Sequence, residues 1–158
     1  IDTTNVMTEP FIATRGICVM PEAHPLAALE TITPIDLDGV PLVSLAPDDT
    51  ARKQLDTALR GAGSQPKIVV ETQFAASVCQ LVAEGAGVGL TNAMAFVASE
   101  FENRGLIARA FEPSITFRAL LIQPPQRARS RQLDDLLHIL LKERDALALA
   151  CESRFGKV

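Results

Sequence analysis

Polar side chains that could bind a small charged molecule follow three short apolar runs of the sequence, at points where each run is expected to lead into a helix. A helix start offers backbone N–H groups to a carboxylate, whereas a pair of adjacent aspartates attracts an ammonium group. A cleft that offers both is matched to a zwitterion such as an amino acid. The candidate ligand-binding residues are Ser44, Asp48, Asp49, Thr50, Thr72, Gln73, Phe74, Thr91 and Asn92.

Helix capping is the alternative explanation for part of this set. Serine, threonine, aspartate and asparagine are favoured just before a helix, because their side-chain oxygens accept hydrogen bonds from its first N–H groups. Capping alone would account for the polar residues at the three helix starts, namely Asp49 or Thr50, Thr72 and Asn92. It explains Gln73 and Phe74 less easily, so both explanations stay open at this point.

The sequence patterns that could indicate catalysis or nucleotide binding do not hold up when their spacing is compared with known motifs. The glycines of residues 85–89 (GAGVG) resemble a dinucleotide fingerprint, but Leu90 stands where a glycine is required. They also follow a helix and precede a strand, whereas a phosphate-binding loop runs from strand to helix. We interpret them as a helix end and a tight turn. His24 has no partner at a recognisable spacing, which favours a structural or surface role. We therefore expect no enzyme, metal or cofactor.

Strands and helices alternate around the candidate residues. We expect strands at 41–45, 68–70 and 88–90, followed by helices that start near 47–50, at Thr72 and at Asn92. The helices should end at glycines, and the last should run to Gly105. The run 68–70 suits a strand buried on both faces. In an α/β sheet of this kind, ligands bind at the carboxyl ends of the strands.

Further strands are expected at 16–20, 106–111 and 115–122, whereas residues 1–14 show no clear period. Residues 126–131 form a short basic link without aromatic residues, which favours a solvated loop. A long amphipathic helix should run from Ser130 to about Ala150 and pack its apolar stripe on the sheet. That stripe consists of Leu133, Leu136, Leu137, Leu140, Leu141 and Leu147.

Composition limits the class of protein. The chain has 158 residues, 47% of them hydrophobic, and a net charge of −4, which argues against nucleic-acid binding by these residues alone. Its three cysteines form no CxxC pair, which indicates buried free thiols in a reducing, cytoplasmic setting. No apolar run is long enough to span a bilayer, and no export signal is visible. Because the sequence begins at Ile1, we expect a piece of a longer protein.

Several short patterns together resemble the effector-binding domain of LysR-type transcriptional regulators. They are GICVMP at 16–21 with HPLA at 24–27, TPxDL at 33–37, VET at 70–72 and LVAxGxGV at 81–88. The resemblance covers nearly the whole chain. The wording of residues 71–79 is most similar to the subgroup that senses diaminopimelate, octopine and nopaline. One departure is Thr91-Asn92-Ala93, where that subgroup tends to have asparagine followed by proline.

This resemblance implies a periplasmic-binding-protein-like (type 2) α/β domain of two lobes joined by crossing strands near 15–20 and 117–121. One lobe should be complete and the other truncated. Residues 1–20 would be a remnant of lobe I with the first crossing strand, and 21–116 would be lobe II. Residues 117–158 would form the second crossing strand and a C-terminal helix that returns to lobe I.

The function implied is that of a sensor. An amino-acid-like or opine-like effector would bind between the lobes, in contact with the candidate residues and assisted by Arg52, and would control DNA binding by an N-terminal winged helix-turn-helix outside this chain. A homodimer or tetramer is expected, with 50–61 and 74–84 as contact faces, and no membrane. The alternatives are a solute-binding protein of an amino-acid transporter and an enzyme on a similar two-lobed fold.

Overall fold

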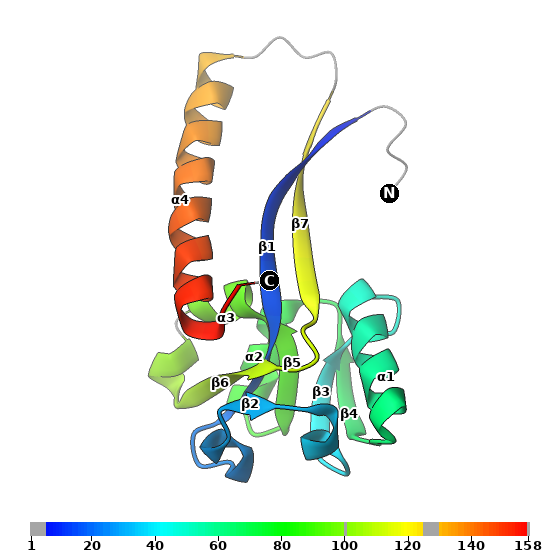
Figure 1. Cartoon of the computed structure of the whole chain (residues 1–158). Coiled ribbons are helices and arrows are strands. Elements are labelled where there is room, and N and C mark those ends of the chain that lie inside the picture. Colours follow the sequence, from blue (N-terminus) through cyan, green and yellow to red (C-terminus); the bar gives the residue numbers. More distant parts are fainter. Residues whose placement is uncertain (1–5, 100, 125–129, 158) are drawn as a thin grey trace.

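The computed structural model describes residues 6–99, 101–124 and 130–157, so most of the basic link at 126–131 lies outside the described residues. Seven strands form the sheet, in the order β2-β6-β1-β5-β3-β4, with β7 paired to β1 (Figure 1). The strands are β1 (Met7–Pro21), β2 (Thr31–Ile32), β3 (Pro41–Leu45), β4 (Lys67–Thr72), β5 (Val88–Asn92), β6 (Leu106–Phe111) and β7 (Thr116–Gln123). The α-helices are α1 (Thr50–Ala62), α2 (Ala75–Ala83), α3 (Ala93–Ala98) and α4 (Arg131–Phe155).

Strand β1 is longer than expected and belongs to two parts of the structure. Its second half lies between β5 and β6 and runs antiparallel to both. Its first half leaves the sheet and pairs only with β7, from Met7 opposite Gln123 to Arg15 opposite Thr116. The register shifts between Pro10 and Ile12. A proline is tolerated there because one side of a two-stranded ribbon needs no further ladder hydrogen bond. Residues 7–14, which show no clear period in the sequence, are therefore part of a strand.

Helices cover both faces of the sheet at β3 and β5. On one face, Leu55 and Leu59 of α1 pack with Leu42 of β3 and Val88 of β5. On the other face, α2, α3 and the end of α4 cover a cluster that contains Val43, Val78, Cys79, Val82 and Phe96. Alternate residues of β1 enter the two clusters, because successive strand side chains point to opposite faces. The predicted strand–helix series over 41–98 is confirmed.

Strand β4 is the last strand in the sheet order, and the expectation that it is buried on both faces was wrong. Ile68 is 38% exposed and Val69 48% exposed, whereas Val70 packs against the cluster beneath α2. Leu42 of β3 lies opposite Ile68 and Val43 lies opposite Val70, so the pairing skips Val69 and the register shifts at this point. An apolar run does not reveal whether a strand lies at the centre or at the edge of its sheet, because that depends on which other strands pair with it.

The helix expected to run from Asn92 to Gly105 is interrupted. Helix α3 ends at Ala98, and a separate 3-10 turn, η3, spans Phe101–Arg104. Phe96 and Phe101 are both buried in the same cluster. On one continuous helix they would point about 140° apart, since each residue turns the chain by about 100°. The break allows both rings to reach the same core.

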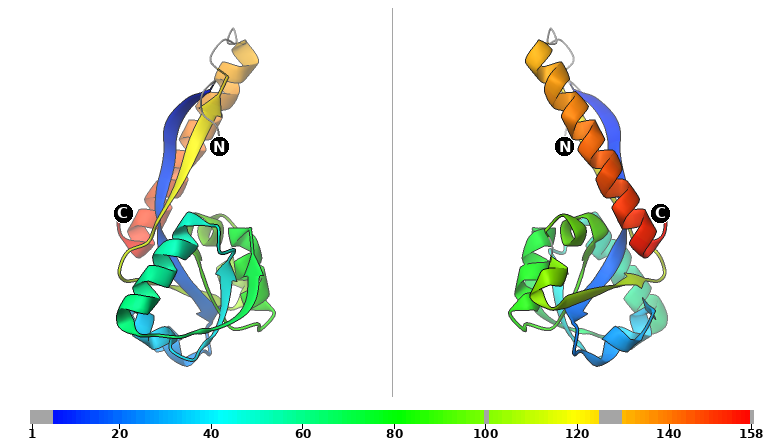
Figure 2. Two further views of the ribbon diagram at one scale, coloured as in Figure 1. Left: turned by 90° about the vertical axis from the view of Figure 1, so that its right-hand side faces the viewer. Right: turned by 90° about the vertical axis from the view of Figure 1, so that its left-hand side faces the viewer.

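Helix α4 begins at Arg131, one residue after the predicted start at Ser130, and the Ser130 hydroxyl accepts a hydrogen bond from the Leu133 N–H at 3.3 Å. It runs on to Phe155 and stands beside the β1–β7 ribbon (Figures 1 and 2). Its last turns pack on α3, where the rings of Phe155 and Phe96 meet edge to face at 6.4 Å.

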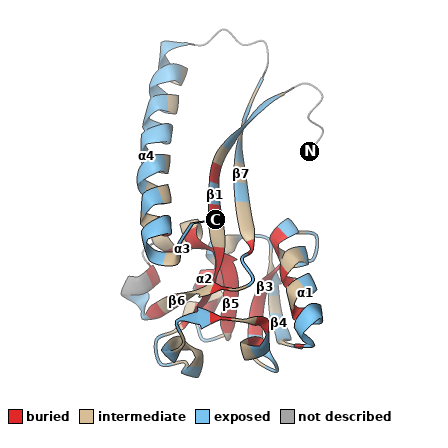
Figure 3. Ribbon diagram, viewed as in Figure 1, coloured by how far each residue is buried: buried red, intermediate tan, exposed pale blue. Residues whose placement is uncertain are grey.

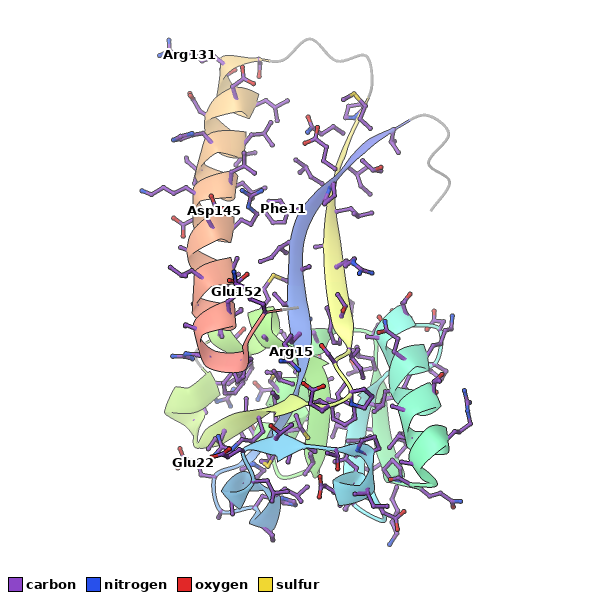
Figure 4. All side chains as sticks on the ribbon, viewed as in Figure 1. Phe11, Arg15, Glu22, Arg131, Asp145 and Glu152 are labelled. Carbon is purple, nitrogen blue, oxygen red and sulfur yellow. The ribbon has the colours of Figure 1, made fainter. Side chains whose placement is uncertain are left out.

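The expected packing of the α4 stripe on the sheet was wrong over most of its length. Leu136 is 57%, Leu140 38% and Leu141 37% exposed. Cys151 is the only buried residue of α4, and most of the helix is coloured as exposed in Figure 3. Higher up, the Arg144 guanidinium lies 5.8 Å from the centre of the Phe11 ring, which brings α4 next to the ribbon (Figure 4). The sheet does not extend beneath this part of α4, so the apolar stripe has little to pack against.

Close packing between α2 and β5 depends on Gly89. A Cβ atom there would lie 2.5 Å from Val78 Cγ1 and 2.9 Å from Val82 Cγ2. The interpretation of residues 85–89 as a helix end and turn is confirmed, because α2 stops at Ala83, Gly85 has a φ of +85° and β5 begins at Val88.

Replacing Gly89 with alanine should lower the free energy of unfolding by about 1–3 kcal/mol, because the added methyl group overpacks the α2–β5 contact. Gly61→Ala is the matched control, since Gly61 lies within α1 and a Cβ there meets no atom within 4 Å. That control should be neutral or stabilising by up to about 1 kcal/mol. Urea unfolding followed by circular dichroism measures both, and equal stability of the two variants would contradict this packing.

Candidate functional site

The carboxyl ends of β3, β4 and β5 meet along one edge of the sheet. Leu45 at the end of β3 lies opposite Thr72 of β4, and Val43 lies opposite Gly89 of β5. Asn92 at the end of β5 lies opposite Gly16, the point where β1 leaves the sheet for the ribbon. The rim formed by these three strand ends therefore faces the side from which the ribbon and α4 rise (Figure 1).

Arg52 of α1 ties two of these strand ends together. Its Nη1 donates to Ser44 Oγ at 3.1 Å, to the Leu45 carbonyl at 2.8 Å and to Glu71 Oε1 at 2.8 Å. Its Nε donates to Asp56 Oδ1 at 2.8 Å, one turn further along α1. The Arg52 side chain is only 10% exposed. It therefore joins α1, β3 and β4 directly beneath the rim.

Burial by itself lowers the pKa of Arg52, but hydrogen bonds and charge from Asp56 and Glu71 outweigh it and raise the pKa overall. The guanidinium therefore stays charged at any physiological pH. Ser44 is 1% exposed, and its oxygen accepts from this guanidinium. Glu71 was not among the predicted site residues, although it directly follows the apolar run of β4, and its side chain is 42% exposed.

Two of the predicted residues act as helix caps. Asp49 Oδ1 accepts from the N–H groups of Ala51 at 2.7 Å and Arg52 at 3.2 Å. Asn92 Oδ1 accepts from Ala95 N–H at 2.7 Å at the start of α3. The capping explanation is therefore confirmed for Asp49 and Asn92.

Thr72 does not cap α2, contrary to that explanation. The helix begins three residues later, at Ala75, and the Thr72 hydroxyl instead accepts from Phe74 N–H at 3.3 Å within the connecting turn. Thr91 is fully buried and donates to the Ala75 carbonyl at 3.2 Å, which attaches the start of α2 to β5. Because Phe74 occupies the cap position without a side-chain hydrogen bond, no side chain caps α2.

The remaining predicted residues are exposed on the same rim. Asp48 and Gln73 lie in the turns that follow β3 and β4, Thr50 opens α1, and Phe74 is 68% exposed. The nine predicted residues therefore divide into buried or half-buried groups with partners inside the protein and exposed groups that can meet a ligand. The structure brings both sets to one edge of the sheet.

Arg15 is a further charged residue at the base of the ribbon that the sequence did not single out. It forms an ion pair with Glu112, and its Nη1 donates to the Phe155 carbonyl at 3.2 Å. It thus joins β1 to the end of α4 (Figure 4). Its pairing partner lies 97 residues away and gives no local signal.

His24 and the cysteines have structural environments. His24 Nδ1 accepts from Leu26 N–H at 3.2 Å, so the structural interpretation of this histidine is confirmed. Cys18, Cys79 and Cys151 are all buried free thiols, as predicted. Burial raises the pKa of all three, that of Cys79 to about 12.

Within 6–99, 101–124 and 130–157, no three His, Cys, Asp or Glu side chains are grouped so that they could hold a metal ion. In the same ranges no helix has the length and apolar character needed to cross a membrane.

The chain belongs to the LysR substrate binding domain family, whose model matches residues 2–145. It is 30% identical over 146 residues to the regulatory protein NocR of Agrobacterium tumefaciens, covering 92% of this chain and 48% of NocR. It is 35% identical over 114 residues to the transcriptional activator protein LysR of Escherichia coli, covering 72% of this chain and 36% of that protein. The chain thus spans about half the length of NocR, or less in the case of LysR.

Solved structures agree on the fold. The CcmR regulatory domain of Synechocystis PCC6803 in complex with 2-PG superposes with a TM-score of 0.68 at 14% identity, over 91% of this chain and 69% of that one. The predicted fold class is therefore confirmed as the periplasmic-binding-protein-like, two-lobed type of LysR regulatory domains. The chain is a ligand-binding regulatory domain, and the transporter alternative is set aside because these relatives are regulators.

Replacing Arg52 with alanine should lower the free energy of unfolding by about 1–3 kcal/mol, because the buried Leu45 carbonyl and Ser44 hydroxyl would each lose a charged donor. Arg60→Ala is the control, since Arg60 is exposed on the same helix and donates a hydrogen bond to Thr57 Oγ1 at 3.3 Å. Chemical denaturation compares the two. A loss no larger for Arg52→Ala than for Arg60→Ala would rule out a structural role for the Arg52 network.

The three thiols should react slowly with Ellman's reagent in the native protein at pH 8. Raised pKa values keep them protonated, and the thiolate is the reactive form. Unfolding in guanidinium restores ordinary pKa values and access, so all three should then react within minutes. Rapid reaction of the native protein would mean that a cysteine is accessible.

Proposed function

We propose that this domain senses a small amino-acid-like molecule at the rim formed by the ends of β3, β4 and β5. The observation that carries the proposal is the convergence of exposed Asp48, Thr50, Gln73 and Phe74 on one edge of the sheet, in a domain of a family that binds small-molecule effectors. The buried members of the predicted set would support the site by fixing the strand ends.

The charge and hydrogen-bonding groups of the rim support a zwitterionic ligand. Asp48 is exposed, and Glu71 keeps 42% of its side chain exposed while it pairs with Arg52. Both carboxylates would attract an ammonium group. Helix α2 begins beside Gln73 without a side-chain cap, which leaves its first N–H groups to donate hydrogen bonds to a carboxylate. An aliphatic or aromatic part of the ligand would contact the Phe74 ring.

The ribbon and α4 support the proposed division into residues 1–20, 21–116 and 117–158, with the ligand held between two lobes. Apolar side chains on this upper part are unusually exposed: Met7, Leu120, Ile122, Leu136 and Ile139 are between 42% and 58% exposed. Apolar surface of this extent favours burial against further protein. In the proposal, the rest of the second lobe covers it.

For the whole protein, we propose a regulator that acts in the cytoplasm without catalysis and binds DNA through a winged helix-turn-helix outside this chain. The relatives named regulator and activator are about twice as long or more, which leaves room for such a segment. A homodimer or tetramer with contacts at 50–61 and 74–84 would pass a change in lobe arrangement to DNA. The coupling requires that the effector bind one arrangement more tightly than the other.

Replacing Gln73 with alanine should weaken effector binding by the intact protein about tenfold, which corresponds to the loss of one hydrogen bond of about 1.4 kcal/mol. Isothermal titration calorimetry with L-lysine, L-arginine, diaminopimelate and octopine first identifies a ligand and then compares variants. Gln132→Ala is the control, because Gln132 is an exposed glutamine on α4, away from the rim.

Equal affinity of the Gln73→Ala variant and the wild type would remove Gln73 from the site. Enzymatic turnover of the bound ligand by the intact protein would overturn the sensor proposal in favour of an enzyme. Loss of affinity in Gln73→Ala with unchanged melting temperature is the result expected for a residue that contacts the ligand and does not support the fold.

A further inference from the structure

A second hollow lies away from the rim, where the end of α4 meets β6 and the turn before β2. Its volume is about 320 Å³, and its walls include Glu30, Ala108, Arg109, Ala110, Arg154 and Phe155. None of the predicted effector residues lines it. Strand β1 separates β6 from β5, β3 and β4, whose ends form the rim. The two places are therefore distinct.

Arg109 is held rigidly at this hollow. Its Nε donates to the Leu29 carbonyl at 2.6 Å, its Nη2 to the Ala27 carbonyl at 2.8 Å and its Nη1 to the Ala108 carbonyl at 3.2 Å. These acceptors are neutral, and no salt bridge to Arg109 is found among the described residues. A guanidinium has five N–H donors, so two remain for a ligand. Its side-chain entropy is already lost, which favours binding.

The other walls add a second guanidinium to the hollow and leave room for a small molecule. Arg154 at the end of α4 adds a second guanidinium, while Glu30 is the one carboxylate of the lining. Ala108 and Ala110, alternate residues of β6, are small enough to leave space beside Phe155. Arginine binds carboxylate and phosphate oxygens through paired N–H groups.

We propose that this hollow is a second ligand site, which binds a small oxyanion carried as a carboxylate or a phosphate. Its walls come from α4 on one side and from β6 and the turn before β2 on the other. A bound anion would therefore favour the arrangement in which α4 rests on this part of the sheet. Such a ligand would regulate the domain only through its different affinity for the two arrangements.

Isothermal titration calorimetry of the intact protein with inorganic phosphate and with succinate, at constant ionic strength and without effector, tests the site. We expect a Kd on the order of 1 mM or tighter for at least one of them. Binding of phosphate alone would indicate a phosphate-bearing ligand, and binding of succinate alone a carboxylate-bearing one. Because no effector is used, a lack of phosphate or succinate binding does not affect the proposed sensing at the rim. A lack of amino-acid binding at the rim likewise does not affect the proposed site in the hollow.

Variants locate the binding. Arg154→Gln should weaken it about tenfold through loss of a charged donor, whereas Glu30→Gln should strengthen it by removing repulsion. Ala110→Leu should block it by filling the hollow. Arg118→Gln is the matched control, because Arg118 is an exposed arginine of β7 that does not line the hollow.

Three results would overturn the proposal. The first is that neither phosphate nor succinate binds at 10 mM, a concentration about ten times the expected Kd. The second is an equal loss of affinity in Arg118→Gln and Arg154→Gln. The third is undiminished binding by a folded Ala110→Leu variant. Arg109 itself is left unchanged in these tests, because its three backbone hydrogen bonds also hold the turn before β2.

Discussion

The structure depends on the requirement that one long strand, β1, pair its backbone along its whole length. From Gly16 onward it lies between β5 and β6, and from Met7 to Arg15 it pairs only with β7. Because buried backbone N–H and C=O groups must be paired, this one strand sets the register of the lower sheet and the direction of the ribbon. It also fixes where α4 can stand, since α4 contacts β1 along its side and α3 at its end.

Around that strand, charged groups join elements that are distant in the sequence. Arg52 connects α1 to the ends of β3 and β4, and Arg15 connects β1 to the end of α4. Arg109 attaches the turn before β2 to the edge of β6. Arginine suits this role because its planar group can donate several hydrogen bonds at once and remains charged when partly buried. These three side chains thus brace the rim, the base of the ribbon and the second hollow.

The proposed sensing at the rim depends on the same arrangement. The buried polar residues are occupied by internal hydrogen bonds, which makes the strand ends rigid, while their exposed neighbours are left to meet a ligand. A rigid rim lowers the entropy lost on binding. In the proposal, an effector that binds one lobe arrangement more tightly than the other acts through α4 and the ribbon, which rise from the same side as the rim (Figure 1).

Much of the local structure could be predicted from the sequence. The caps Asp49, Asn92 and Ser130, the glycine turn at 85–89 and the strands 41–45 and 106–111 depend on residues only a few positions apart, so their signals are local. The tertiary structure decided the rest. It made β4 an edge strand, left the α4 stripe exposed and gave Arg52 its partners. Burial and ion pairing depend on which distant segment lies alongside, and the spacing of neighbouring residues carries no record of that.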